Sequence, residues 1–222
     1  MSTLCGIIFD LDGTLLDTLR DIADSMNTAL RALGYPSHPV DDYRLMIGTG
    51  VDDLARRSLP EGVSDPAIIQ KTISVMREEY GKRWADTTRP YEGAQPLLRA
   101  LREAGVPMAV LSNKPQEFTE MCVRRFLDES SFSIVMGSSP DFPRKPDPAA
   151  ALHIAKVMGI DAAALAFAGD SGTDMDTAAY AGMYAVGVLW GFRKRQELVD
   201  HGARYLAAHP GDILKLFSGD AR

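Results

Sequence analysis

The sequence of 222 residues predicts an α/β protein: a doubly wound parallel sheet with a small helical domain inserted after its first strand. Three observations support this fold class. The apolar run Ile7-Ile8-Phe9 ends abruptly in polar residues, as a buried strand does. From Tyr91 onward, short apolar strands alternate with helical patterns. Residues 17–89 show helical spacing without a convincing strand, so we expect a core of residues 1–16 and 90–222 and a helical domain of residues 17–89.

The helical domain begins directly after the first strand. Apolar residues recur at helical spacing from Leu19 to Leu33, and Gly34-Tyr35-Pro36 ends that helix. Further short helical segments are expected at 39–46, 51–59 and 66–84.

The second part of the chain alternates between the two kinds of element. Strands are expected at 107–111, 132–136, 165–168, 184–188 and 205–206. Helices are expected at 95–104, 116–127, 148–158, 173–181 and 196–201, and 211–217 continues the series. Such alternation is typical of a Rossmann-like core, in which helices cover both faces of a parallel sheet.

The composition argues against several classes of partner. The formal net charge is -6, and the densest basic cluster, Arg193-Lys194-Arg195, is interpreted as a solvated helix start, so we expect no nucleic-acid partner. No apolar run approaches the roughly 20 residues of a membrane span, and a signal-peptide pattern is missing. Cys5 and Cys122 have no neighbouring Cys or His at metal-ligand spacing. We therefore expect a cytoplasmic monomer or homodimer that does not bind membranes.

The most informative motif follows the first strand. Asp10 and Asp12 are two residues apart where the strand ends, so their carboxylates can converge on one small volume. A cation, a lysine or a shared proton would relieve their repulsion. Gly13 permits a tight turn that brings backbone N–H groups to the same place, and Thr14 adds a hydroxyl. The alternative is an ordinary Asp-Gly turn after a core strand.

Polar residues also follow the other expected strands. They are Ser112-Asn113-Lys114, Lys145-Pro146-Asp147-Pro148 and Gly169-Asp170 with Asp174. Ligands of open parallel sheets bind outside the carboxyl ends of the strands, so we expect these groups at one edge. Each alone has a structural alternative: Ser112 a helix cap, Lys145 a loop lysine, and Asp170 and Asp174 a cap and a first-turn acid.

Together these groups match the requirements of phosphoryl transfer. A phosphate needs its charge neutralised, its oxygens held and a nucleophile in line. Asp10 and Asp170 can supply carboxylates to Mg²⁺, and Lys145 supplies a compact positive charge. Ser112 can hold a phosphate oxygen, and Asn113 with nearby backbone N–H groups, including that of Gly13, can assist.

The four segments together resemble the haloacid dehalogenase superfamily of phosphohydrolases, in order and spacing, over nearly the whole chain. The resemblance implies that Asp10 is the nucleophile and forms an aspartyl-phosphate, and that Asp12 is the general acid and base. It implies Mg²⁺ as cofactor, bound by Asp10, the backbone carbonyl of Asp12, and Asp170. It further implies that Ser112 and Lys145 bind phosphate.

In the same resemblance Asp174 is a supporting acid near the metal or Lys145, and the helical domain is a cap that excludes water and reads the leaving group. Within the superfamily the chain is most similar to phosphoglycolate phosphatases, through Ile47-Gly48-Thr49-Gly50, Arg89-Pro90-Tyr91-Glu92-Gly93 and Gly187-Val188-Leu189-Trp190-Gly191-Phe192. We therefore expect a small phosphorylated metabolite as substrate. Thr49 and Arg57 are candidate specificity residues of the cap, and Arg57 would meet a substrate carboxylate.

Other functions of the same superfamily stay open at this point. A pyrophosphatase or a nucleotidase would use the same motifs. Haloacid dehalogenases lack the second aspartate and need no metal, so Asp12 and Asp170 argue against that activity. Phosphohexose mutases carry a histidine shortly after the first motif, where this chain has Asp17-Thr18-Leu19-Arg20-Asp21. A binding module without activity would tend to lose the nucleophile or the acid, which are both present.

Overall fold

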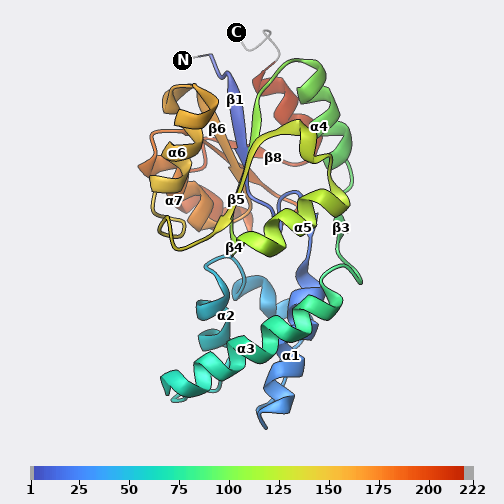
Figure 1. Ribbon diagram of the computed structural model, residues 1–222. Coiled ribbons are helices and arrows are strands. Elements are labelled where there is room, and N and C mark those ends of the chain that lie inside the picture. The colour runs from blue at the N-terminus through green and yellow to red at the C-terminus, as the bar shows by residue number, and fades with distance from the viewer. Residues whose placement is uncertain (1–2, 218–222) are drawn as a thin grey trace.

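The core of the molecule is a parallel sheet of six strands, seen in the upper part of Figure 1, in a computed structural model that describes residues 3–217. The order across the sheet is β5-β4-β1-β6-β7-β8. These strands are β1 (Gly6–Phe9), β4 (Met108–Pro115), β5 (Phe132–Ser138), β6 (Leu165–Gly169), β7 (Tyr184–Val188) and β8 (Tyr205–Ala207). Every pairing in this sheet is parallel, so the carboxyl ends of all six strands lie at the same edge.

Helices cover both faces of this sheet, because alternate strand residues point to opposite sides. Ile7 and Phe9 of β1 pack into one hydrophobic cluster, and Ile8 packs into another. The first cluster includes residues of α4 (Ala94–Glu103), α5 (Gln116–Phe126) and η4 (Pro210–Leu216). The second includes residues of α6 (Ala149–Met158), α7 (Gly172–Tyr180) and α8 (Arg195–Asp200). The predicted fold class, a doubly wound parallel sheet, is confirmed.

The strand order reverses at β1, which lies between β4 and β6. The chain adds β4 and β5 on one side of β1 and then returns to add β6, β7 and β8 on the other. Connections on the two sides turn away from each other at such a point, so a crevice opens at the carboxyl ends of β1, β4 and β6.

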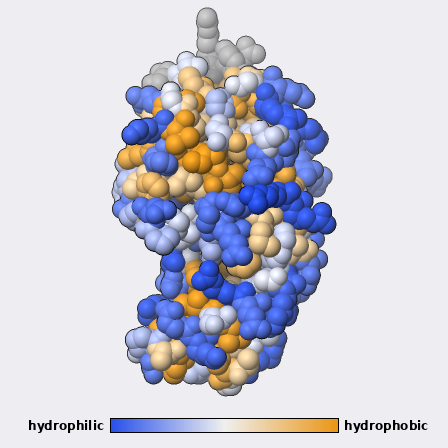
Figure 2. Space-filling model, in the orientation of Figure 1, coloured by the Kyte–Doolittle hydropathy of each residue, from blue (hydrophilic) through white to orange (hydrophobic). Residues whose placement is uncertain are grey.

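Residues 18–88 form a separate group of helices, drawn below the sheet in Figure 1. They are α1 (Leu19–Ala32), η1 (Val40–Leu45), α2 (Val51–Ser58) and α3 (Pro66–Arg83). We call them the helical insert. Their apolar faces form a hydrophobic cluster of their own, which Phe118 and Phe192 of the sheet part join. The surface is hollowed on one side where the two parts meet (Figure 2).

Two short strands connect the helical insert to the sheet part. β2 (Leu16–Asp17) and β3 (Arg89–Pro90) pair antiparallel, so the chain leaves and re-enters the core at one place. Just beyond them, both carboxylate oxygens of Asp21 accept hydrogen bonds from the backbone and hydroxyl groups of Thr87 and Thr88. These bonds fix the start of α1 against the returning chain.

Most expected elements occur within about two residues of their predicted ends, and the differences have local causes. The expected helices at 39–46 and 211–217 are 3₁₀ helices, η1 and η4, which are wound more tightly than α-helices. β4 extends four residues past its expected end at 111, because Pro115 is still in register with Ser138 of β5. Among residues 3–217, none of the helices could cross a membrane.

Candidate active site

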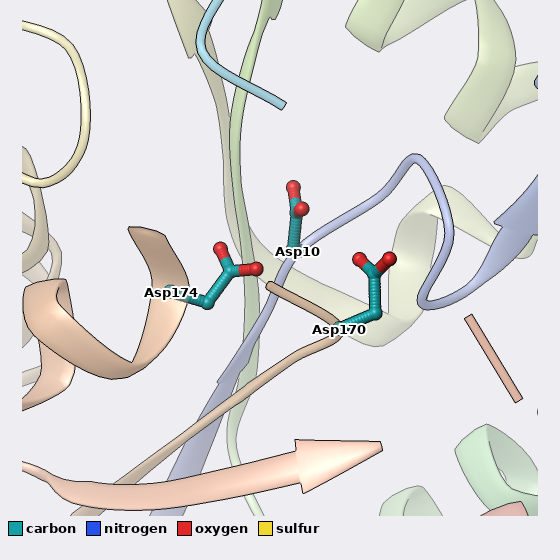
Figure 3. Close-up of side chains that lie close together, drawn as sticks. All are labelled: Asp10, Asp170 and Asp174. Carbon is teal, nitrogen blue, oxygen red and sulfur yellow. The ribbon is translucent and has the colours of Figure 1, made fainter. Parts of the chain in front are cut away.

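Three buried carboxylates meet at the reversal point of the sheet (Figure 3). Asp10 directly follows β1, Asp170 directly follows β6, and Asp174 lies in the first turn of α7. One carboxylate oxygen from each lies within 4.8 Å of the others. Figure 3 shows the three side chains around a common space. The neighbouring parallel strands β1 and β6 therefore place charges that are 160 residues apart in sequence beside one another.

Two glycines make this approach possible. Gly13 has φ +86°, which favours glycine, and a Cβ there would overlap the carboxylate of Asp170. A Cβ on Gly191 would overlap the same side chain and the carbonyl oxygen of Gly13. Asp170 thus packs against two backbone segments that only glycine allows so close.

Lys145 joins two of the carboxylates. Its Nζ lies 3.0 Å from Oδ1 of Asp10 and 2.6 Å from Oδ1 of Asp174, and its side chain is only 2% exposed. Oδ2 of Asp174 accepts hydrogen bonds from the backbone N–H and the hydroxyl of Ser171. Oδ1 of Asp10 also accepts the N–H of Leu11 at 2.7 Å. The second oxygen of Asp10 has no hydrogen-bond partner among the residues described.

Asn113 fixes the position of Lys145. Its side-chain oxygen accepts the backbone N–H of Lys145 at 2.9 Å, and its amide donates to the carbonyls of Lys145 and Gly48 at 3.0 and 2.9 Å. The Asn113 amide therefore holds the loop that carries Lys145 and touches the helical insert. Ser112 is buried beside it and lines the same cavity as Asp10.

Asp12 faces a different partner from Asp10. Both of its carboxylate oxygens accept from Nζ of Lys114, at 3.0 and 3.1 Å. Lys114 is buried, and its Nζ lies 4.7 Å from the ring centroid of Tyr80 on α3. Burial alone would lower the pKa of Lys114, but Asp12 together with Tyr80 and Cys122 outweighs this effect, so the pKa is raised. The ammonium group therefore stays charged and links Asp12 to the helical insert.

Asp170 is held by two donors. The hydroxyl of Thr14 donates to its Oδ1 at 3.2 Å, and the backbone N–H of Phe192 donates to its Oδ2 at 2.7 Å. Both donors come from loops at the carboxyl ends of strands, β1 and β7, so the same edge of the sheet supplies the carboxylate and its support.

The electrostatics of the cluster favour a bound cation. Burial raises the pKa of Asp10, and Lys145 only partly offsets this rise. Burial and the neighbouring carboxylates of Asp174 and Asp10 raise the pKa of Asp170. When all are ionised, the four carboxylates of Asp10, Asp12, Asp170 and Asp174 face two ammonium groups. The two remaining negative charges match one divalent cation, and oxygen donors are what Mg²⁺ prefers.

A cavity opens from Asp10 and Asp12 toward the helical insert. Besides Ser112, Asn113 and Lys114, its lining is largely apolar: Ile22, Ile47, Gly48, Gly50, Val51, Leu54, Met76, Arg77, Tyr80, Pro115 and Phe118. Lys114, Tyr80 and Arg77 are lining residues for which the sequence motifs predict no role. Lys114 could have been predicted as a site residue, because it directly follows Ser112-Asn113. Arg77 could not, because its spacing in α3 does not distinguish it from the other charged residues of that helix.

Thr49 and Arg57, the two expected specificity residues, do not line this cavity. The hydroxyl of Thr49 donates to Asp53. The guanidinium group of Arg57 pairs with Asp53 at 2.8 Å and donates to the carbonyl of Leu45 at 3.0 Å. Both side chains are thus engaged within the helical insert, whereas the expected residues of the sheet edge lie together.

Comparison with known proteins gives a consistent result. Residues 7–188 match the family of haloacid dehalogenase-like hydrolases. A phosphoglycolate phosphatase of Pseudomonas putida is 32% identical over 190 residues, which cover 84% of this chain and 70% of that protein. One of Psychrobacter arcticus is 33% identical over 198 residues, 86% of each chain. The crystal structure of a predicted phosphoglycolate phosphatase from Haemophilus somnus superimposes with a TM-score of 0.87 at 28% identity, covering 97% of this chain and 99% of that one.

Proposed function

Since the chain belongs to the family of haloacid dehalogenase-like hydrolases, we propose that it hydrolyses a small, phosphoglycolate-like phosphomonoester with Mg²⁺, through an aspartyl-phosphate on Asp10. The observation that carries this proposal is the buried cluster of Asp10, Asp170, Asp174 and Lys145 at the reversal point of the sheet. The relatives named as phosphoglycolate phosphatases support the substrate class.

Asp10 is the proposed nucleophile. The hydrogen bonds of Leu11 and Lys145 hold its Oδ1, which turns the carboxylate and leaves Oδ2 for attack on phosphorus. The new bond joins Oδ2 to phosphorus while the bond from phosphorus to the leaving oxygen breaks with its electron pair. Lys145 and the Ser112 hydroxyl stabilise the charge on the phosphoryl oxygens.

Asp12 is the proposed general acid and base. It gives a proton to the leaving alcohol in the first step. For this, its hydrogen bond with Lys114 must be replaced by one with the leaving oxygen. In the second step it takes a proton from water, whose oxygen attacks phosphorus and releases Asp10. Asp12 then holds this proton for the next cycle; when the proton is lost to solvent, the carboxylate pairs again with Lys114.

The metal would be held by the side chains of Asp10 and Asp170 and the backbone carbonyl of Asp12. The donor set fits Mg²⁺, because it consists of oxygen atoms and carries an excess negative charge. When bound, the ion would neutralise the phosphate and align it with Asp10. Asp174 has both oxygens engaged by Lys145 and Ser171, so we give it a supporting role.

We assign residues 17–89 as a cap and residues 1–16 and 90–222 as the catalytic core. The helical insert lies over the carboxyl edge of the sheet, and the cavity has walls from both parts. A cap in this position would exclude water from the aspartyl-phosphate until the leaving group has departed.

The test is a substrate panel with the purified protein and Mg²⁺. It compares 2-phosphoglycolate, inorganic pyrophosphate, a nucleoside monophosphate, a hexose phosphate and an aryl phosphate. We expect the highest kcat/KM for 2-phosphoglycolate. Preference for pyrophosphate or the nucleotide would favour the alternatives within the superfamily. Activity that survives complete removal of the metal, or that is missing for every phosphomonoester, would overturn the proposal.

A further inference from the structure

The wall of the cavity that the helical insert supplies is almost wholly apolar. Ile22 of α1, Leu54 of α2 and Met76 of α3 contribute to it, together with Ile47 and Val51. A leaving group bound to a phosphate at Asp10 would extend along this wall. Such a wall suits a short carbon skeleton, because polar groups placed against it would lose their hydrogen bonds to water.

Only two side chains on that wall carry hydrogen-bonding groups, Arg77 and Tyr80. A hexose or a nucleoside has several hydroxyl or ring polar atoms, and each unpaired one is costly to bury. The lining therefore disfavours polyhydroxylated leaving groups and favours one with a single polar end.

Arg77 is a cation on this wall whose charge is not neutralised by a described neighbour. Its side chain is exposed, and it makes no hydrogen bond or ion pair with another residue of 3–217. The two acids that follow it on α3, Glu78 and Glu79, pair instead with Lys82 and Arg83. Lys114, the other cation of the lining, is bound by Asp12.

Tyr80 supplies the second polar side chain of this wall. Tyr80 lies three residues after Arg77, which places the two on neighbouring positions of α3. Its side chain is 3% exposed, and its hydroxyl lies near Lys114 and Cys122 without a hydrogen bond of good geometry within the described chain. Tyr80 therefore adds a polar group close to Arg77 on a wall that is otherwise apolar.

We infer that Arg77 is the specificity-determining residue of the proposed phosphatase and binds a carboxylate at the far end of the leaving group. The substrate class is then a phosphomonoester whose leaving group is a short, otherwise apolar carboxylic acid. Arginine suits this task because its planar group can bind both carboxylate oxygens. Arg57, the candidate that the sequence suggested, is engaged with Asp53 outside the cavity.

A binding experiment tests the inference without turnover. The probes are 3-phosphonopropionate, in which a CH₂ group replaces the ester oxygen of phosphoglycolate, and propylphosphonate, which lacks the carboxylate. Dissociation constants are measured by calorimetry with Mg²⁺ for the native protein and for Arg77→Gln, Arg77→Lys, Arg57→Gln and Arg56→Gln. Arg56 is the matched control: an exposed arginine of α2 that does not line the cavity.

We expect Arg77→Gln to weaken binding of 3-phosphonopropionate about 10- to 100-fold, as for loss of a charged hydrogen bond. Binding of propylphosphonate should change less than about threefold, Arg77→Lys should be intermediate, and Arg56→Gln should leave both constants unchanged. Equal weakening of both probes by Arg77→Gln would overturn the inference, and so would a selective loss in Arg57→Gln in place of Arg77→Gln.

The inference rests on the proposed function, and kinetics separate the two. If the native protein hydrolyses an aryl phosphate with Mg²⁺ but Arg77→Gln raises KM equally for 2-phosphoglycolate and the aryl phosphate, the specificity role fails and the phosphatase stands. If the native protein hydrolyses neither, the proposed function fails. A selective rise of KM for 2-phosphoglycolate supports both.

Discussion

At the scale of single residues, Asp10 combines two requirements that conflict. Its carboxylate must be ionised to attack, yet burial raises its pKa. Lys145 at 3.0 Å and the N–H of Leu11 at 2.7 Å favour the ionised form, and so would a metal ion. We therefore expect Asp10→Asn to reduce kcat by at least about a thousandfold, since an amide cannot form the acyl phosphate.

The same substitution should not lower the stability of the protein. It keeps the shape of the side chain and removes one charge from a crowded acidic cluster. Thermal unfolding at neutral pH without Mg²⁺ is the control, with a melting temperature equal to or above that of the native protein. Activity within about tenfold of native, only about 1.4 kcal/mol of barrier, would exclude the covalent mechanism.

Substitution of Asp12 should slow the first step by an amount that depends on the leaving group. Asp12→Asn removes a general acid and base, which are typically worth about 10² to 10⁴ in rate. The loss in the first step should be smaller for aryl phosphates than for alkyl phosphates, because a good leaving group needs less protonation. Single-turnover phosphorylation with both substrate types measures this difference. An identical loss for both would argue against Asp12 as the proton donor.

Residue types and their places relative to strands were enough to predict which groups gather at the sheet edge. Asp10 and Asp170 directly follow β1 and β6, Ser112 lies in the second half of β4, and the loop after β5 carries Lys145. Parallel pairing of these strands brings the four residues to one edge. The specificity residues were harder, because helical spacing alone does not tell which side of α3 borders a cavity. That depends on how the insert sits on the sheet part, which the local sequence does not encode.

At the scale of elements, Arg193 connects the segment before α8 to the helical insert. The prediction that Arg193-Lys194-Arg195 is a solvated helix start is wrong for Arg193. Its side chain is 8% exposed, and its guanidinium group donates to the carbonyls of Leu45 and Ile47 at 3.2 and 2.7 Å. The partner carbonyls lie about 146 residues away in sequence, so no local pattern could reveal the contact.

We expect Arg193→Ala to loosen the segment that links η1 to α2. Loss of these charge-assisted bonds should lower the free energy of unfolding by about 1–3 kcal/mol. Hydrogen exchange of peptides around residues 45–51 should accelerate more than that of the sheet. Arg195→Ala, at an exposed position two residues on, is the matched control and should leave exchange unchanged. Equal protection of residues 45–51 in both variants would contradict this role.

At the scale of the whole molecule, the alternation of apolar strands and amphipathic helices was sufficient to predict the doubly wound sheet. Ile7 and Phe9 are buried on one face of the sheet and Ile8 on the other. A strand that is covered on both faces has a continuous apolar sequence, which is why this pattern predicted the fold. The end of β4 was not predictable in the same way. Ser112-Asn113-Lys114 resembles a loop, and the pairing with β5 is irregular between Leu111 and Pro115 before it resumes at Pro115.

The buried acidic cluster should also make the stability of the whole molecule depend on pH and metal. A carboxyl group whose pKa is higher in the folded state binds its proton more tightly there, so the folded state is favoured at low pH. Asp10 and Asp170 have raised pKa values. Their contribution is therefore lost as pH rises above about 4, the ordinary carboxyl pKa, and through their raised folded values. The raised pKa values of Lys114 and Lys145 contribute nothing over this range, because both lysines are charged in either state.

We accordingly expect the metal-free protein to melt at a lower temperature at pH 8 than at pH 5.5, and Mg²⁺ to raise the melting temperature more at pH 8. An ion at about 100 times its Kd stabilises the folded state by about 2.7 kcal/mol. Asp170→Asn is the decisive control: it removes one raised carboxyl group and one proposed ligand, so both the pH dependence and the response to Mg²⁺ should shrink together. A full Mg²⁺ response in Asp170→Asn would place the ion elsewhere, whereas a pH dependence that persists without a Mg²⁺ response would separate the acidic cluster from metal binding.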